Sequence, residues 1–203
     1  MSTRLIRAFA LVGVSAALAL GGASVAHASE TDPSSEPSSG AFCWHEQITE
    51  REACADSAQE LADTVLLEYG LRILGPVSEP DAAKAYVPSA AALGLAARAV
   101  SPAATYVIGA FYTEPGLTGG SKVVTTGVTS NPCAQAGSYT YGYGNFVALW
   151  NDATSSFEGY GHCGFRLYWD ADYTGSVYGP YFSRHSLGVF DNQASSFEAQ
   201  KTD

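Results

Sequence analysis

The sequence predicts a mainly β domain that follows a shorter, mainly helical segment. From about Thr105 onward, Gly, Tyr, Phe, Val, Ser and Thr replace Ala and Leu, and Gly and Pro recur at short intervals. Apolar and polar residues also alternate there, which is typical of all-β domains. In addition, a nine-residue string occurs twice, as WNDATSSFE at 150–158 and as FDNQASSFE at 190–198. We therefore expect a boundary near residue 104 and a β domain over 105–200 that contains two copies of one unit.

The first 41 residues have the composition of export and linker segments. Arg4 and Arg7 precede an apolar run over 8–20, and small residues follow up to Ala28. This pattern is typical of a secretory signal peptide over 1–28, and the run is shorter than the ~20 residues that span a bilayer. Residues 29–41 are rich in Ser, Pro and Glu, which favours a disordered linker. We expect a secreted chain without a membrane span.

Residues 42–104 are expected to form the helical N-terminal segment. Thr49 and Glu52 fit a capping box, which predicts a helix start, and Gly75-Pro76 predicts its end. A weaker Ala-rich helix is expected over 89–100. The apolar residues of the first helix recur at helical spacing, at Ala58, Leu61, Ala62, Val65, Leu66, Tyr69 and Ile73.

All four cysteines follow the expected signal peptide. An even number of cysteines in an exported chain predicts two disulfides, for which three connectivities are possible. We favour Cys43–Cys54 and Cys133–Cys163, because each pair lies within one predicted module. The first bridge would then join the first turn of the helix to the residues before its cap.

Charge and motifs narrow the classes of function. The formal net charge is −10, which argues against a nucleic-acid partner and suits solubility or cation binding. His45, His162 and His185 are isolated, and no H-x-x-x-H or G-x-S-x-G motif occurs. We therefore expect a protein that is not an enzyme.

The two copies align beyond the repeated string. Tyr168, Tyr173 and Gly175 have the spacing of Tyr112, Leu117 and Gly119, and Glu114 and Asp170 occupy the same offset. The first copy holds roughly sixteen extra residues, which the alignment places around 131–141.

These paired motifs resemble the βγ-crystallin superfamily, in particular its microbial calcium-binding members. Each copy has a Y/F-x4-Y/F-x-G corner followed by an N/D-N/D-x-x-S/T-S loop, at 151–156 and at 191–196. Leu117, which replaces an aromatic residue, and the insertion depart from the family pattern. The resemblance implies two Greek-key motifs that form a βγ-crystallin-like β-sandwich over 105–200.

The resemblance also implies two Ca²⁺ sites. Asn, Asp and Ser supply hard oxygen donors, which Ca²⁺ prefers, and the loops lack the Cys and His that zinc prefers. The same residues could instead serve the turns alone. One expected site combines Asn151, Asp152 and Ser155 with Asp170, and the other combines Asp191, Asn192 and Ser195 with Glu114.

Two other functions stay open. The segment CGFRLYWDADYTGS, with the turn that follows it, resembles secreted crystallin-fold peptidase inhibitors of the metalloproteinase type. An extracellular protease would then be the partner, and the loop over 130–136 the inhibitory element. Alternatively, Tyr139, Tyr141 and Tyr143 lie on one face of a strand, where they could bind a glycan or a cell surface or pack across strands.

Overall fold

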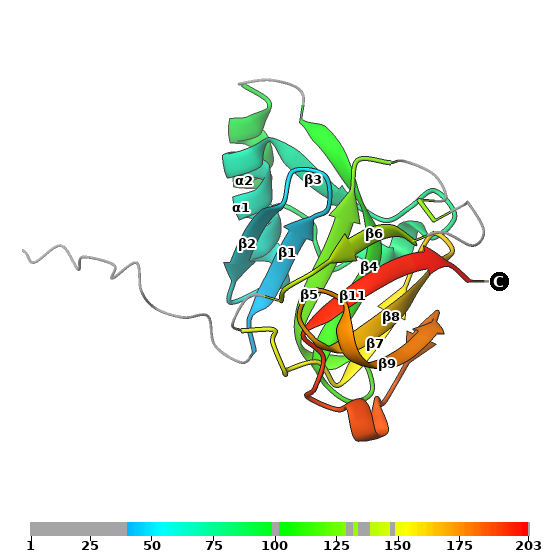
Figure 1. Cartoon of the computed structure of the whole chain (residues 1–203). Coiled ribbons are helices and arrows are strands. Elements are labelled where there is room, and N and C mark those ends of the chain that lie inside the picture. Colours follow the sequence, from blue (N-terminus) through cyan, green and yellow to red (C-terminus); the bar gives the residue numbers. More distant parts are fainter. Residues whose placement is uncertain (1–39, 99–101, 129–131, 134–138, 147–148, 203) are drawn as a thin grey trace, which may run out of the picture. The chain divides into compact units, whose positions relative to one another are not determined.

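The computed structural model describes residues 40–98, 102–128, 132–133, 139–146 and 149–202 (Figure 1). The expected signal peptide, residues 29–39 of the linker, and all of the 130–136 loop except Pro132 and Cys133 lie outside these ranges. Within the described residues, no helix is both long enough and apolar enough to cross a membrane.

The two repeats form two interlocked sheets. One sheet has the strand order β10-β7-β4-β5, continued by β1 and β2, and the other has the order β6-β11-β8-β9. Each repeat therefore places its third strand, β6 or β10, in the sheet of the other repeat. This exchange is a pair of Greek keys, and the predicted βγ-crystallin-like β-sandwich is confirmed. The strands are β4 (Ala103–Glu114), β5 (Thr118–Thr126), β6 (Tyr139–Tyr143), β7 (Ser156–Gly159), β8 (Cys163–Asp170), β9 (Thr174–Tyr181), β10 (Ser183–Arg184) and β11 (Ser196–Lys201).

A cluster of phenylalanine rings fills the space between the sheets. Phe111 of β4 lies 4.9 Å from both Phe165 and Phe197, measured between ring centroids, and 6.0 Å from Phe157. All four side chains are fully buried. They come from the first and last strands of both repeats, so the repeated Phe of the SSFE string is a core residue.

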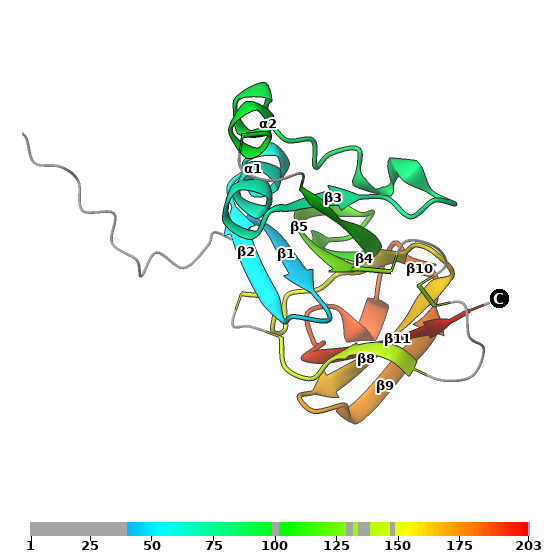
Figure 2. The ribbon, with the colours of Figure 1, turned by 90° about the horizontal axis from the view of Figure 1, so that it is seen from above.

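The segment before residue 104 is built into the sheet of the first repeat. It contains β1 (Phe42–Glu46), β2 (Arg51–Ala55), α1 (Ala58–Tyr69), β3 (Leu71–Leu74), the 3₁₀ helix η1 (Pro80–Ala83) and α2 (Ala90–Ala96). Strand β1 pairs with β5 and β3 pairs with β4, both in parallel, which makes this sheet seven-stranded. Helix α1 packs on the outer face of the sheet (Figure 2), where Leu61 and Val65 join Val107 and Val123 in a second core.

The prediction that a helix starts at Thr49 is wrong. Residues 51–55 form β2, which pairs with β1 as an antiparallel hairpin. The Thr49 hydroxyl and amide both donate to the carboxylate of Glu46, at 2.6 and 2.7 Å, and Glu52 binds Lys122 rather than the start of a helix. Both members of the proposed capping box are therefore engaged in other contacts.

Helix α1 begins eight residues later than its predicted start and ends earlier. Its N-cap is Ser57, whose hydroxyl accepts the amide of Glu60 at 3.2 Å. Gly70 ends the helix in the left-handed conformation, with φ 67°, which glycine adopts at little cost. The predicted stop at Gly75-Pro76 is therefore wrong, and Ile73 lies in β3. The weaker helix is confirmed over Ala90–Ala96, with Ser89 as its N-cap.

Both predicted disulfides are confirmed, as Cys43–Cys54 and Cys133–Cys163. Cys43 and Cys54 are direct cross-strand partners in the β1–β2 hairpin, so this bridge does not involve a helix. The second bridge joins the insertion of the first repeat to β8.

Candidate metal centre

The two repeated loops lie against each other. The amide of Asp152 donates to the carbonyl of Ala194 at 3.1 Å, and the amide of Asn192 donates to the carbonyl of Thr154 at 3.0 Å. These reciprocal bonds relate equivalent positions of the two repeats. Each loop therefore fixes the backbone of the other.

The second Asx of each loop has an unusual backbone conformation. Asp152 and Asn192 both have φ 55°, in the left-handed region that Asn and Asp tolerate better than most other residues. The repeated Asx at this position thus has a conformational role besides any role as an oxygen donor.

The first serine of each loop reaches the Asx of the other loop. The Ser195 hydroxyl lies 3.5 Å from Oδ1 of Asp152, and the Ser155 hydroxyl lies 3.3 Å from Oδ1 of Asn192. We call these the Asp152–Ser195 pair and the Asn192–Ser155 pair. The structure therefore groups the residues differently from the sequence prediction, which placed each serine with the Asx of its own loop.

The second serine of each loop fastens a hairpin corner. Ser156 donates to the carbonyl of Glu114 at 2.6 Å and accepts the amide of Leu117 at 3.0 Å. Ser196 donates to the carbonyl of Asp170 at 2.7 Å. Both corner residues named in the sequence prediction therefore lie beside the loops, and their side chains are exposed.

The corners are equivalent despite their different sequences. Leu117 has φ 62° and Tyr173 has φ 61°, and the amide of Tyr173 bonds Ser196 as the amide of Leu117 bonds Ser156. The departure from the family pattern at Leu117 therefore leaves the corner backbone unchanged.

The last residue of the repeated string binds the tyrosine that opens each corner. The Tyr112 hydroxyl donates to Glu158 at 2.6 Å, and the Tyr168 hydroxyl donates to Glu198. Burial, together with the neighbouring carboxylate, raises the pKa of Tyr112 above its ordinary value and that of Tyr168 to about 12.

The first Asx of each loop behaves differently in the two repeats. The Asn151 amide donates to Oδ2 of Asp152 at 3.0 Å. In contrast, Oδ1 of Asp191 is buried without a hydrogen-bond partner. Among the described residues, no group of three or more His, Cys, Asp and Glu side chains is placed to hold a metal ion, so a metal here would rely on Ser, Asn and backbone oxygens as well as single carboxylates.

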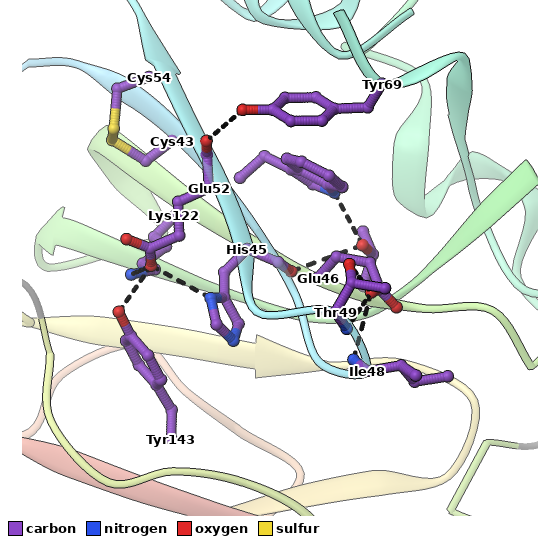
Figure 3. A network of polar contacts seen from close by, with 12 residues as sticks. Cys43, His45, Glu46, Ile48, Thr49, Glu52, Cys54, Tyr69, Lys122 and Tyr143 are labelled. Atoms are coloured by element: carbon purple, nitrogen blue, oxygen red, sulfur yellow. Dashed lines mark hydrogen bonds and ion pairs between the residues drawn. A yellow bond between two sulfur atoms is a disulfide. The ribbon is translucent and has the colours of Figure 1, made fainter. Parts of the chain in front are cut away.

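A buried ionic network, absent from the sequence prediction, surrounds Glu52 (Figure 3). Oε1 of Glu52 accepts Nζ of Lys122 at 2.8 Å and the hydroxyl of Tyr143 at 2.6 Å, and lies 3.1 Å from Nδ1 of His45. The Lys122 ammonium also lies 4.4 Å from the centre of the Tyr143 ring. The network joins β2, β1 and β5 to β6, which belongs to the other sheet.

Burial and the network act in opposite directions on the pKa of each charged group. Burial alone would raise the pKa of Glu52, but the bonds from His45, Lys122 and Tyr143 lower it from 4.5 to about 2. Burial lowers the pKa of Lys122, which is only 1% exposed. An ammonium at this depth requires an anion beside it, and Glu52 supplies that anion.

Two of the three tyrosines of β6 pack inward. Tyr141 and Tyr143 contact the core between the sheets, which is the packing alternative of the sequence prediction. The side chain of Tyr139 lies outside the described part of the chain.

Two interlocked Greek keys, each with the same corner and the same Asx–Ser loop, give the domain a βγ-crystallin-like fold. No family model and no curated protein matches the chain. Among solved structures, the N-terminal domain of Protein S aligns with 47% of this chain and 97% of its own, with 15% identity and a TM-score of 0.35. A βγ-crystallin domain from Flavobacterium johnsoniae aligns with 47% of this chain and 96% of its own, with 18% identity and a TM-score of 0.34. A βγ-crystallin from an archaeon aligns with 45% of this chain and 95% of its own, with 22% identity and a TM-score of 0.31.

Proposed function

We propose that this protein is a secreted, non-catalytic calcium-binding protein that holds one Ca²⁺ at each Asx–Ser pair. The observation that carries the proposal is the approach of two oxygens from different loops, at 3.5 Å in the Asp152–Ser195 pair and 3.3 Å in the Asn192–Ser155 pair. Two oxygens at about 2.4 Å from a Ca²⁺ ion, seen from it at about 90°, lie about 3.4 Å apart. Neither pair needs to move far to bind an ion.

Further oxygens are available beside each pair. The carbonyls of Glu114 and Asp170 are oriented by Ser156 and Ser196, and their exposed carboxylates add negative charge. Oδ1 of Asp191 has no hydrogen-bond partner, so a cation would satisfy it. This mixture of neutral and anionic oxygens suits Ca²⁺, which accepts six to eight oxygens in loose geometry, better than Mg²⁺, which requires an octahedron.

The proposal is tested by titrating the secreted chain, freed of metal, with Ca²⁺ in a calorimeter. The wild type should bind two ions, and Ser155→Ala and Ser195→Ala should each lose one of them. At a hundredfold excess of free Ca²⁺ over Kd, each site should add about 2.7 kcal/mol to the free energy of unfolding. Mg²⁺ at the same concentration should produce a smaller shift in melting temperature.

A matched control is Ser78→Ala, because Ser78 is exposed and lies outside both repeats. This variant should bind Ca²⁺ as the wild type does. The proposal fails if the wild type shows neither heat of binding nor a rise in melting temperature at millimolar Ca²⁺. It fails equally if the two serine variants retain both ions.

A further inference from the structure

A short segment joins the Glu52 network to one of the two Asx–Ser pairs. Residues 143–146 begin at the last residue of β6, and they form hydrogen bonds to Ser195 of the Asp152–Ser195 pair and to Asp172 of the neighbouring corner. The amide of Phe146 donates to the carbonyl of Ser195 at 2.8 Å. The carbonyl of Gly144 accepts the amide of Asp172 at 2.6 Å, which holds the corner that begins at Asp170.

The other end of this segment is held by the N-terminal part of the chain. The Tyr143 hydroxyl donates to Glu52 on β2 at 2.6 Å. The Lys122 ammonium lies 4.4 Å from the Tyr143 ring and 5.8 Å from the Phe146 ring. Tyr143 and Phe146 also pack edge to face, 5.6 Å apart. The position of residues 143–146 therefore depends on the charged network as well as on the core.

In the second repeat, the equivalent segment is not joined to the Glu52 network. There, the amide of Leu187 donates to the carbonyl of Ser155 at 3.1 Å, and the carbonyl of His185 accepts the amide of Gly116 at 2.7 Å. The position equivalent to Tyr143 is Arg184, whose guanidinium stacks on Tyr181 of the same repeat at 3.4 Å. The two pairs thus share a backbone pattern but differ in what supports it.

We propose that the N-terminal segment sets the calcium affinity of the Asp152–Ser195 site selectively, through the Glu52–Tyr143 hydrogen bond. Tyr143 is then a positioning residue for this site: it fixes the segment that orients the Ser195 backbone and the Asp170 corner. The calcium affinity of the Asn192–Ser155 site does not depend on this hydrogen bond. This inference rests on the proposed calcium binding.

The test first isolates each site in a variant that keeps only that site, and then removes the Glu52–Tyr143 hydrogen bond in each variant. Ser155→Ala leaves the Asp152–Ser195 site, and Ser195→Ala leaves the Asn192–Ser155 site. Tyr143→Phe is added to each background, because it removes one hydroxyl and keeps the ring in the core. Calorimetry with Ca²⁺ should show about a fivefold or greater rise in Kd in the Ser155→Ala background and a change of less than about twofold in the Ser195→Ala background.

Tyr86→Phe is the matched control. It removes another buried tyrosine hydroxyl that binds the N-terminal segment to β5, through Ser121 at 2.9 Å, but it has no bond to Glu52. It should leave Kd unchanged in both backgrounds, even where it lowers melting temperature in the absence of Ca²⁺. An equal effect of Tyr143→Phe on both sites, or no effect on either, would overturn the inference. A wild type that binds no Ca²⁺ at all would instead overturn the proposed function, and the coupling with it.

Discussion

Replacing Glu52 by Gln should remove an acid-sensitive part of the stability of this protein. The folded-state pKa of Glu52 is about 2, below its usual 4.5. Because the pKa is lowered on folding, the associated stabilisation is present above about pH 4.5 and is lost as the pH falls through about 2. The wild type should lose it progressively across this window, whereas the Gln variant has no such group to titrate.

The size of the effect follows from the shift. A difference of about 2.5 pKa units corresponds to about 3 kcal/mol of unfolding free energy. The figure is of the right order because the Glu52 side chain is only 29% exposed and its partner Lys122 is 1% exposed. In the variant, the buried ammonium of Lys122 loses its anion, and breaking a buried pair in this way typically destabilises by about 3–5 kcal/mol.

Urea denaturation between pH 7 and pH 2.5, with Ca²⁺ removed, measures the loss of stability of the wild type with falling pH and the destabilisation of the Glu52→Gln variant. The wild type should be more stable than Glu52→Gln by about 3 kcal/mol at pH 7, and this difference should shrink steadily below about pH 4.5. Glu68→Gln, which changes an exposed carboxylate of α1, is the control and should differ little from the wild type throughout. A difference between wild type and Glu52→Gln that stays constant with pH would refute the reasoning.

Three further predictions concern the core, the disulfides and the two repeated Asx–Ser loops. Phe111→Ala should lower the free energy of unfolding by about 3–5 kcal/mol in urea denaturation, whereas Val189→Ala, at a side chain 86% exposed, should change it by less than about 0.5 kcal/mol. The native protein should contain no thiol that alkylation can label before reduction. Loss of the Cys133–Cys163 bridge, which spans 30 residues, should lower the free energy of unfolding by about 3–4 kcal/mol in urea denaturation. Asn192→Asp should lower the calorimetric Kd of the Asn192–Ser155 site, because it adds an anionic oxygen where the other site has Asp152; an unchanged or higher Kd would contradict the proposed donor.

The features that could be predicted well from the sequence are those that depend on residues close together along the chain or on a pattern that occurs twice. The repeated string marks one core residue, one left-handed Asx and one corner serine in each repeat, so two copies of a pattern support each other. The pairing Cys43–Cys54 could be predicted because both residues lie close together along the chain. In contrast, the true start of α1 has the signal Ser57-x-x-Glu60, and the T-x-x-E match at Thr49 has the same spacing eight residues earlier.

The remaining features depend on contacts between distant residues. The β1–β2 hairpin exists because β1 finds the free edge of β5, some 80 residues later, and nothing in residues 42–55 alone indicates that edge. Glu52, Lys122 and Tyr143 likewise meet across 91 residues. A charged residue that looks exposed in the sequence can therefore be buried, provided that its counter-ion comes from another element.

The exchange of serines between the loops has the same physical origin. When two Greek keys exchange their third strands, each loop leaves its own repeat and meets its counterpart across the interface, as the bonds between Asp152 and Ala194 and between Asn192 and Thr154 show. The pairs that the structure brings together, Asp152 with Ser195 and Asn192 with Ser155, therefore each take one residue from either repeat. The consequence is that a single repeat, expressed by itself, should lack both Asx–Ser pairs. Duplication here does not give two independent Asx–Ser pairs; it creates the interface at which each pair is completed.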